Sequence, residues 1–173
     1  MRRSGVVMVF GLAAAAACLS GARSAYAAQA HDHASCPHMA KDAHATGVDH
    51  RHDETTGMAG DTSVHHFDVT SRGGVIRLET AEAADETGRD QARAHLEHVV
   101  QSFAAGDFAM PMFIHGQVPP GAATMARLRD SIRYRYEPTD RGGRVTIDTS
   151  NREARKAIQE FLRFQIRDHH TQD

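Results

Sequence analysis

An internal repeat limits the folds open to the C-terminal part of this chain. Residues Arg72–Thr80 (RGGVIRLET) match residues Arg141–Thr149 (RGGRVTIDT). Each glycine pair lies between two short runs of alternating apolar and polar residues, which predicts a hairpin turn that needs a positive φ. Helical periodicity follows each second run, so the sequence predicts two ββα halves. Turn chemistry alone also favours glycine here, which leaves two unrelated hairpins as an alternative.

The helices and strands of both halves can be placed from their apolar spacing. Residues Ala92 to Phe103 and Ala154 to Gln165 carry apolar side chains on one face of a 3.6-residue repeat. Gly106 is expected to cap the first helix, and Ser150 with Glu153 resembles a capping box before the second. Alternation in the strands places Arg133, Arg135 and Arg144 on a solvated face. We therefore predict an α+β domain over residues 64–173, with helices packed on one face of an antiparallel sheet.

The segment between the halves is apolar but rich in proline. Pro111 and the run Pro119–Gly121 predict a loop without regular structure, packed against the core. A short helix is expected over residues Ala122 to Asp130.

The N-terminus has the pattern of a secretory signal peptide over residues 1–27. Arg2 and Arg3 precede an apolar run over Val6 to Leu19, and Ala25-Tyr26-Ala27 is a small-x-small cleavage site. The run is too short for a good membrane anchor, so no stable membrane span is expected. The sequence predicts a periplasmic or secreted protein. Lipidation at Cys18 is a weaker alternative because Ala15 stands where a large aliphatic residue is usual.

Residues 28–63 form a predicted disordered arm that is rich in metal-ligating side chains. It is polar and has 2 basic and 6 acidic residues. Imidazole, thiolate and thioether ligands together suit copper or zinc. The ligand candidates are His31, His33, Cys36, His38 and Met39. An incidental unpaired cysteine in a plain tail is the alternative.

Charge balance argues against several classes of partner. The predicted domain has 15 basic and 16 acidic residues, and the arm is acidic. Neither part favours nucleic acid or an anionic membrane. Metal ions are the expected partners, and a protein partner stays open.

Histidines of the domain suggest a second metal site. His95 and His98 are three residues apart on the first predicted helix, His115 ends the proline loop, and His169 follows the last helix. Ordinary surface histidines are the alternative, and Met110 and Met112 are expected to fill the core rather than bind copper.

From His65 onward the chain resembles a family of small exported bacterial proteins that often carry the name aspartate carbamoyltransferase. The resemblance covers the whole predicted domain. It is carried by both glycine turns and by these segments: Arg93–Leu96, Phe103–Phe108, Pro111, Ile114–Gly116, Pro119–Gly121 and Asp168–His169. The family pattern implies His66, His95, His115 and His169 as the site residues.

The sequence therefore predicts an exported, non-enzymatic protein that captures copper or zinc. One alternative is a small domain that binds an organic ligand or a protein. The other is an enzyme that uses His95 and His115. Aspartate carbamoyltransferase activity is improbable, because the chain lacks the Ser-Thr-Arg-Thr loop and about 110 residues cannot form the two α/β domains of that enzyme class.

Overall fold

The computed structural model describes residues 37–58 and 62–171, without the side chains of residues 37–43 and 45. Its elements, in chain order, are α1 (Pro37–Thr56), β1 (Ser63–Thr70), β2 (Gly73–Thr80), α2 (Glu86–Ala105), α3 (Ala109–His115), α4 (Ala122–Arg127), the 3₁₀ helix η2 (Arg129–Ser131), β3 (Ile132–Thr139), β4 (Gly142–Thr149) and α5 (Arg152–Asp168). The predicted α+β class and the two ββα halves are confirmed. Within the described residues, no helix combines the length and the apolar character needed to cross a membrane.

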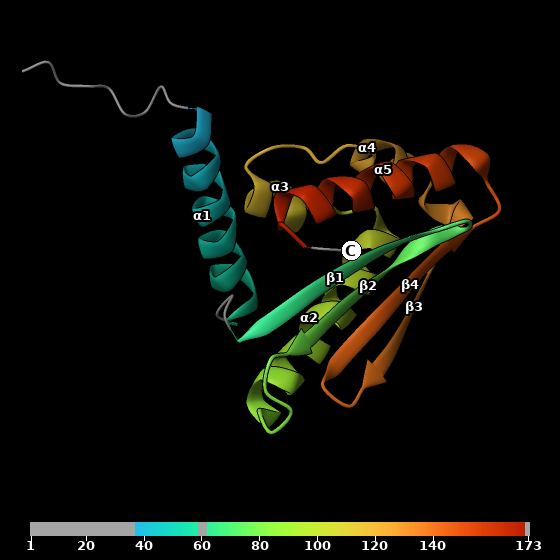
Figure 1. Cartoon of the computed structure of the whole chain (residues 1–173). Coiled ribbons are helices and arrows are strands. Elements are labelled where there is room, and N and C mark those ends of the chain that lie inside the picture. The colour runs from blue at the N-terminus through green and yellow to red at the C-terminus, as the bar shows by residue number, and fades with distance from the viewer. Residues whose placement is uncertain (1–36, 59–61, 172–173) are drawn as a thin grey trace, which may run out of the picture. The chain divides into compact units, whose positions relative to one another are not determined.

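The four strands form one antiparallel sheet in the order β1-β2-β4-β3 (Figure 1). Each hairpin contributes an edge strand and a central strand, and the central strands pair with Ile76 opposite Val145. The repeated segments therefore lie side by side in the middle of the sheet. This arrangement relates the two halves by an approximate twofold axis.

Helices α2 and α5 pack on one face of this sheet. Leu96 of α2 lies against Gly143 of β4, and Leu162 of α5 lies against Gly74 of β2. Side chains of the covered face are buried at every second position of the central strands β2 and β4, whereas Arg133, Arg135 and Arg144 of the other face are exposed. The solvated arginine face expected from the sequence is therefore confirmed.

Three phenylalanines join the helices to one another above the sheet. The rings of Phe103 in α2 and Phe108 before α3 stack with centroids 4.5 Å apart. Phe161 of α5 meets both edge-on, at 5.7 Å and 5.8 Å. Aromatic pairs in this range contribute about 1 kcal/mol each beyond the area they bury.

The glycine pairs serve a different purpose from the one predicted. The turn residues are 71–72 and 140–141, so the glycines begin β2 and β4 instead. Of the four glycines only Gly73 has a positive φ, of 156°. A Cβ on Gly142 would lie 2.0 Å from the carbonyl oxygen of Leu78. Close strand packing, rather than turn geometry, therefore requires glycine there.

The helix caps agree with the sequence at one end and differ at the other. Gly106 ends α2 in the left-handed conformation with φ 81°, as predicted. The N-cap of α5 is Asn151 and not Ser150. Its Oδ1 accepts hydrogen bonds from the amides of Glu153 and Ala154 at 2.9 and 3.1 Å. An Asn side chain at this position satisfies two of the first-turn amides that have no partner within the helix.

The segment around Pro111 is helical, which corrects the predicted loop. Pro111 is the third residue of α3. A proline in the first turn costs no hydrogen bond because the amides there have no partner within the helix. The next predicted helix, Ala122 to Asp130, is divided into α4 and the 3₁₀ helix η2.

Part of the predicted arm belongs to the fold, so 28–63 is too long for a disordered segment. Val48 and His52 lie one helical turn apart on α1 and are buried, as is Met58 after it. The Arg51 Nε donates a hydrogen bond to the carbonyl oxygen of Ile114 at 2.7 Å. Only a few buried side chains hold this helix, and the rest of its segment is polar. Composition alone therefore placed the start of the folded part too late in the chain. β1 also begins at Ser63, one residue before the predicted domain.

Replacing Gly142 by alanine is expected to destabilise the protein strongly. The new methyl group would overlap the Leu78 carbonyl, which should lower the free energy of unfolding by about 3 kcal/mol. Urea denaturation followed by circular dichroism measures this change. As a control, Gly47→Ala in α1 meets only the flexible end of Arg51 and should change stability by less than about 1 kcal/mol. Equal losses in both variants would contradict the close-packing argument.

Candidate metal centre

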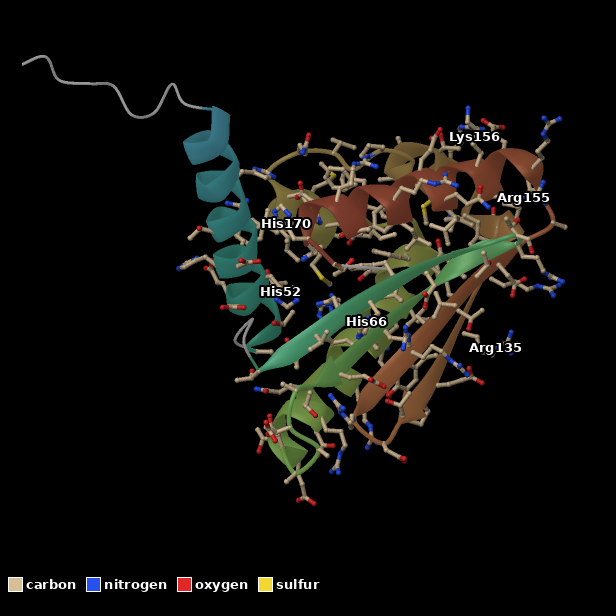
Figure 2. All side chains as sticks on the ribbon, viewed as in Figure 1. His52, His66, Arg135, Arg155, Lys156 and His170 are labelled. Atoms are coloured by element: carbon tan, nitrogen blue, oxygen red, sulfur yellow. The ribbon has the colours of Figure 1, made fainter. Side chains whose placement is uncertain are left out.

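Five histidines from separate segments line one cavity between α1, the sheet and the helices. They are His52 of α1, His65 of β1, His95 of α2, His115 of α3 and His169 just after α5. Figure 2 shows His52 on α1 and, on the sheet, His66, which does not line this cavity. The cavity has a volume of about 50 Å³. We call it the histidine cavity.

The imidazole rings are packed against one another. Ring centroids of His52 and His65 are 4.7 Å apart, and His169 lies 5.9 Å from the first and 5.5 Å from the second. His115 lies 5.0 Å from His169. His95 is 6.2 Å from His52 and 6.3 Å from His65. Two imidazoles that share a tetrahedral zinc ion have centres about 5 Å apart, so several of these separations match shared coordination.

The ring orientations do not yet match a coordination sphere. The planes of His65 and His169 differ by only 23°, so their in-plane lone pairs cannot point to one nearby atom. In contrast, His52, His65 and His95 meet at steep angles of 69° to 88°. Among the described residues, no three His, Cys, Asp or Glu side chains are arranged to hold one metal ion. Shared coordination would therefore require ring rotation and closer approach.

Burial keeps most of these imidazoles uncharged. Desolvation, followed by repulsion from neighbouring histidines, lowers the pKa of His95 to about 4 and that of His169 to about 3. The same causes lower the pKa of His65 well below 6.5. Burial also lowers the pKa of His52, although Asp53 opposes the shift. At neutral pH these four rings each have a lone pair that no proton occupies.

One ring nitrogen of the cluster has no partner. His52 is 6% exposed, and its Nε2 is buried without a hydrogen bond. Its other nitrogen, Nδ1, lies 3.6 Å from the Asp53 carboxylate. A buried polar atom without a partner costs about 1–3 kcal/mol, so this nitrogen favours any group that could bind it.

His115 is held by two partners and is the most constrained ring. Its Nδ1 lies 2.5 Å from Oδ2 of Asp168, and its Nε2 lies 2.8 Å from Oε1 of Gln165. Nε2 of His44 on α1 lies 3.0 Å from the other oxygen of Asp168. Burial alone would raise the pKa of Asp168, but the hydrogen bonds from His115 and His44 outweigh it and lower the pKa. A carboxylate behind an imidazole is the usual way in which proteins orient a ligating histidine.

Of the four histidines that the family resemblance implied, three lie together in the structure and the fourth does not. His95, His115 and His169 line the histidine cavity, whereas His66 lies on the opposite face of β1, beside Arg77 of β2. His65 takes its place. His98, the other half of the predicted pair on α2, is exposed and does not line the cavity.

The remaining predicted ligands fall outside what can be compared. His31, His33 and Cys36 lie outside the described residues. His38 and Met39 belong to α1 by their backbone, and their side chains are not described. The prediction that these five residues bind metal stays a prediction.

Two of the missed residues could have been found from spacing. His65 is two residues before the buried Phe67, so strand alternation places both on the covered face. Gln165 lies one helical turn after Phe161 and one turn before His169, on the buried side of α5. No such signal marked His52, because α1 was not predicted.

Comparisons with protein-family models, curated proteins and solved structures found no match. The resemblance to exported proteins named aspartate carbamoyltransferase therefore stays a prediction.

Acid is expected to destabilise the protein through the buried histidines. An unfolded histidine takes up a proton below about pH 6.5, whereas His95 resists protonation until about pH 4. The contribution of His95 to the free energy of unfolding is therefore complete above pH 6.5. It is lost as the pH falls from 6.5 to about 4, by at most about 1.4 kcal/mol per pH unit. His95→Gln should make the dependence of unfolding free energy on pH shallower, as urea denaturation between pH 4.5 and 7.5 would measure. The matched control is His50→Gln at an exposed position of α1, outside the histidine cavity, which should change the slope much less. A slope that is the same in both variants would argue against a proton-excluding cavity.

Proposed function

We propose that this protein is an exported metal-binding protein that captures copper or zinc, with the histidine cavity as its structured site. The observation that carries the proposal is the convergence of five imidazoles from five separate segments on one small cavity. A core of this size is normally filled by apolar side chains, since histidine is seldom buried without a specific partner.

The charge state of the cluster supports metal capture. His52, His65, His95 and His169 all have lowered pKa values, so protons do not compete for their nitrogens at neutral pH. A metal ion would also remove the cost of the unpartnered His52 Nε2. A cluster that had to be positively charged at neutral pH would need the opposite shift, with histidine pKa values raised above 6.5.

The dimensions of the cavity favour an ion over the organic ligand of the alternative hypothesis. A volume of about 50 Å³ is enough for one ion and a water molecule. Pockets for organic ligands are several times larger, about 300–1,000 Å³. Histidines gathered in so small a space are better suited to coordination than to recognition of a substrate.

Coordination requires a modest rearrangement of the rings. His65 and His169 are nearly parallel, and rotation of one side chain about its Cα–Cβ and Cβ–Cγ bonds would bring both lone pairs to one point. His95 would have to approach the others by about 1 Å to share an ion with Zn–N bonds of ordinary length. To join them, His115 would have to exchange the contact of its Nε2 with Gln165 for the ion.

The test is the thermal stability of the purified chain with and without metal at pH 7. An ion that binds the folded state raises the free energy of unfolding by about 2.7 kcal/mol when its free concentration is 100 times the Kd, which raises Tm by roughly 10 °C. We expect zinc or copper to give this shift. The double variant His65→Gln/His169→Gln should lose it.

The matched control is the double variant His50→Gln/His98→Gln, in which both altered side chains are exposed. It removes the same number of imidazoles from the chain, and its shift should stay intact. If metal raised the Tm of the cavity variant as much as that of the control, the proposal that the histidine cavity binds the metal would be wrong. The predicted arm would then be the only remaining candidate.

A further inference from the structure

We propose that the histidine cavity binds copper in its monovalent state, with Met110 as a thioether ligand beside the imidazoles. This proposal rests on the proposed function and specifies the ion. It is drawn from the side chains that line the cavity and from the absence of carboxylates among them.

Met110 is the one sulfur-containing side chain of the lining. It lies on α3, where it contacts the core and is shared between the histidine cavity and a neighbouring groove beside His98. A thioether is a soft, uncharged ligand that binds Cu(I) well and contributes little to binding of Zn(II). Met112, two residues further along α3, is 41% exposed and lines a different groove. The two methionines of the same short helix therefore have different surroundings.

The lining has no carboxylate ligand among the described residues. It consists of five histidines, one glutamine, one methionine and apolar residues, and no Asp or Glu is among the described residues that line it. Because the desolvation cost of an ion rises with the square of its charge, a divalent ion pays about four times the cost of a monovalent one. A largely apolar cavity without a carboxylate ligand consequently favours the monovalent ion.

Two carboxylates lie behind the imidazoles and partly offset the desolvation cost of a bound ion. The carboxylate of Asp53 lies 3.6 Å from Nδ1 of His52, and that of Asp168 is hydrogen-bonded to Nδ1 of His115. Asp168 already accepts a hydrogen bond from His44, and Asp53 is 39% exposed, so each is partly neutralised or screened by water.

The rest of the cavity lining is consistent with a monovalent ion. Phe67, Phe103 and Phe161 contribute aromatic surface, and Ile76 and Leu96 complete an apolar floor. Cu(I) is selected by soft ligands such as the Met110 thioether, and this floor adds no hard oxygen ligand that would favour Zn(II).

The experiment compares Cu(I) and Zn(II) on the full chain carrying Cys36→Ser, which removes the only thiol of the predicted arm. Cu(I) is kept reduced with ascorbate under nitrogen, and chelators set the free concentration of each ion. The readout is the free metal concentration that gives half of the maximal rise in Tm. We expect this concentration to be at least about tenfold lower for Cu(I) than for Zn(II).

The methionine variants identify the ligand. Met110→Leu should raise the half-point for Cu(I) about tenfold and that for Zn(II) by less than about twofold, because only Cu(I) uses the thioether. Met112→Leu should leave the half-points for both ions unchanged. Each variant is compared with its own metal-free Tm, so a general loss of stability does not affect the result.

The outcomes separate this proposal from the one on which it rests. Tighter or equal binding of Zn(II), or equal effects of Met110→Leu on both ions, would overturn the assignment of Cu(I) and leave metal capture intact. No rise in Tm with either ion would overturn both proposals.

Discussion

The contact of Phe161 with Phe103 and Phe108 holds the parts of this fold that matter for the site. It fixes α5 against α2 and against the start of α3, the three helical segments that supply or adjoin His95, His115 and His169. Phe103 and Phe161 also form part of the cavity floor. The positions of the imidazoles are therefore a consequence of aromatic packing in the core, and a loss of that packing would disperse them.

Placing imidazoles in the core has a thermodynamic cost that ordinary packing would not impose. Desolvated rings such as His65 and His95 exclude a proton that the unfolded chain accepts below about pH 6.5. Apolar side chains of similar size would stabilise the same positions at every pH. A fold that keeps the histidines in spite of this cost is consistent with a site that needs unprotonated nitrogens.

The frame of the domain could be predicted from the sequence because its signals are local. The repeated hairpins, the helical spacing of Leu96 to Phe103 and the cap at Gly106 each depend on neighbouring residues. The site could be predicted only in part, because it joins residues that are distant in sequence. His52 and His169 are brought within 5.9 Å by packing that no short motif encodes. His65 was within reach of the alternation rule and was missed because the resemblance pointed to His66.

The twofold arrangement of the hairpins gives the two edges of the covered sheet face different chemistry. Counting from the aligned Arg72 and Arg141, His65 at one edge corresponds to Tyr134 at the other. Burial raises the pKa of Tyr134, so its phenol keeps its proton, whereas burial strips the proton from His65. One architectural plan has thus produced an electron-pair donor at one end and a proton-holding group at the other. The strand order gives the two halves equivalent positions, and the side chains at a single edge make the halves chemically unequal.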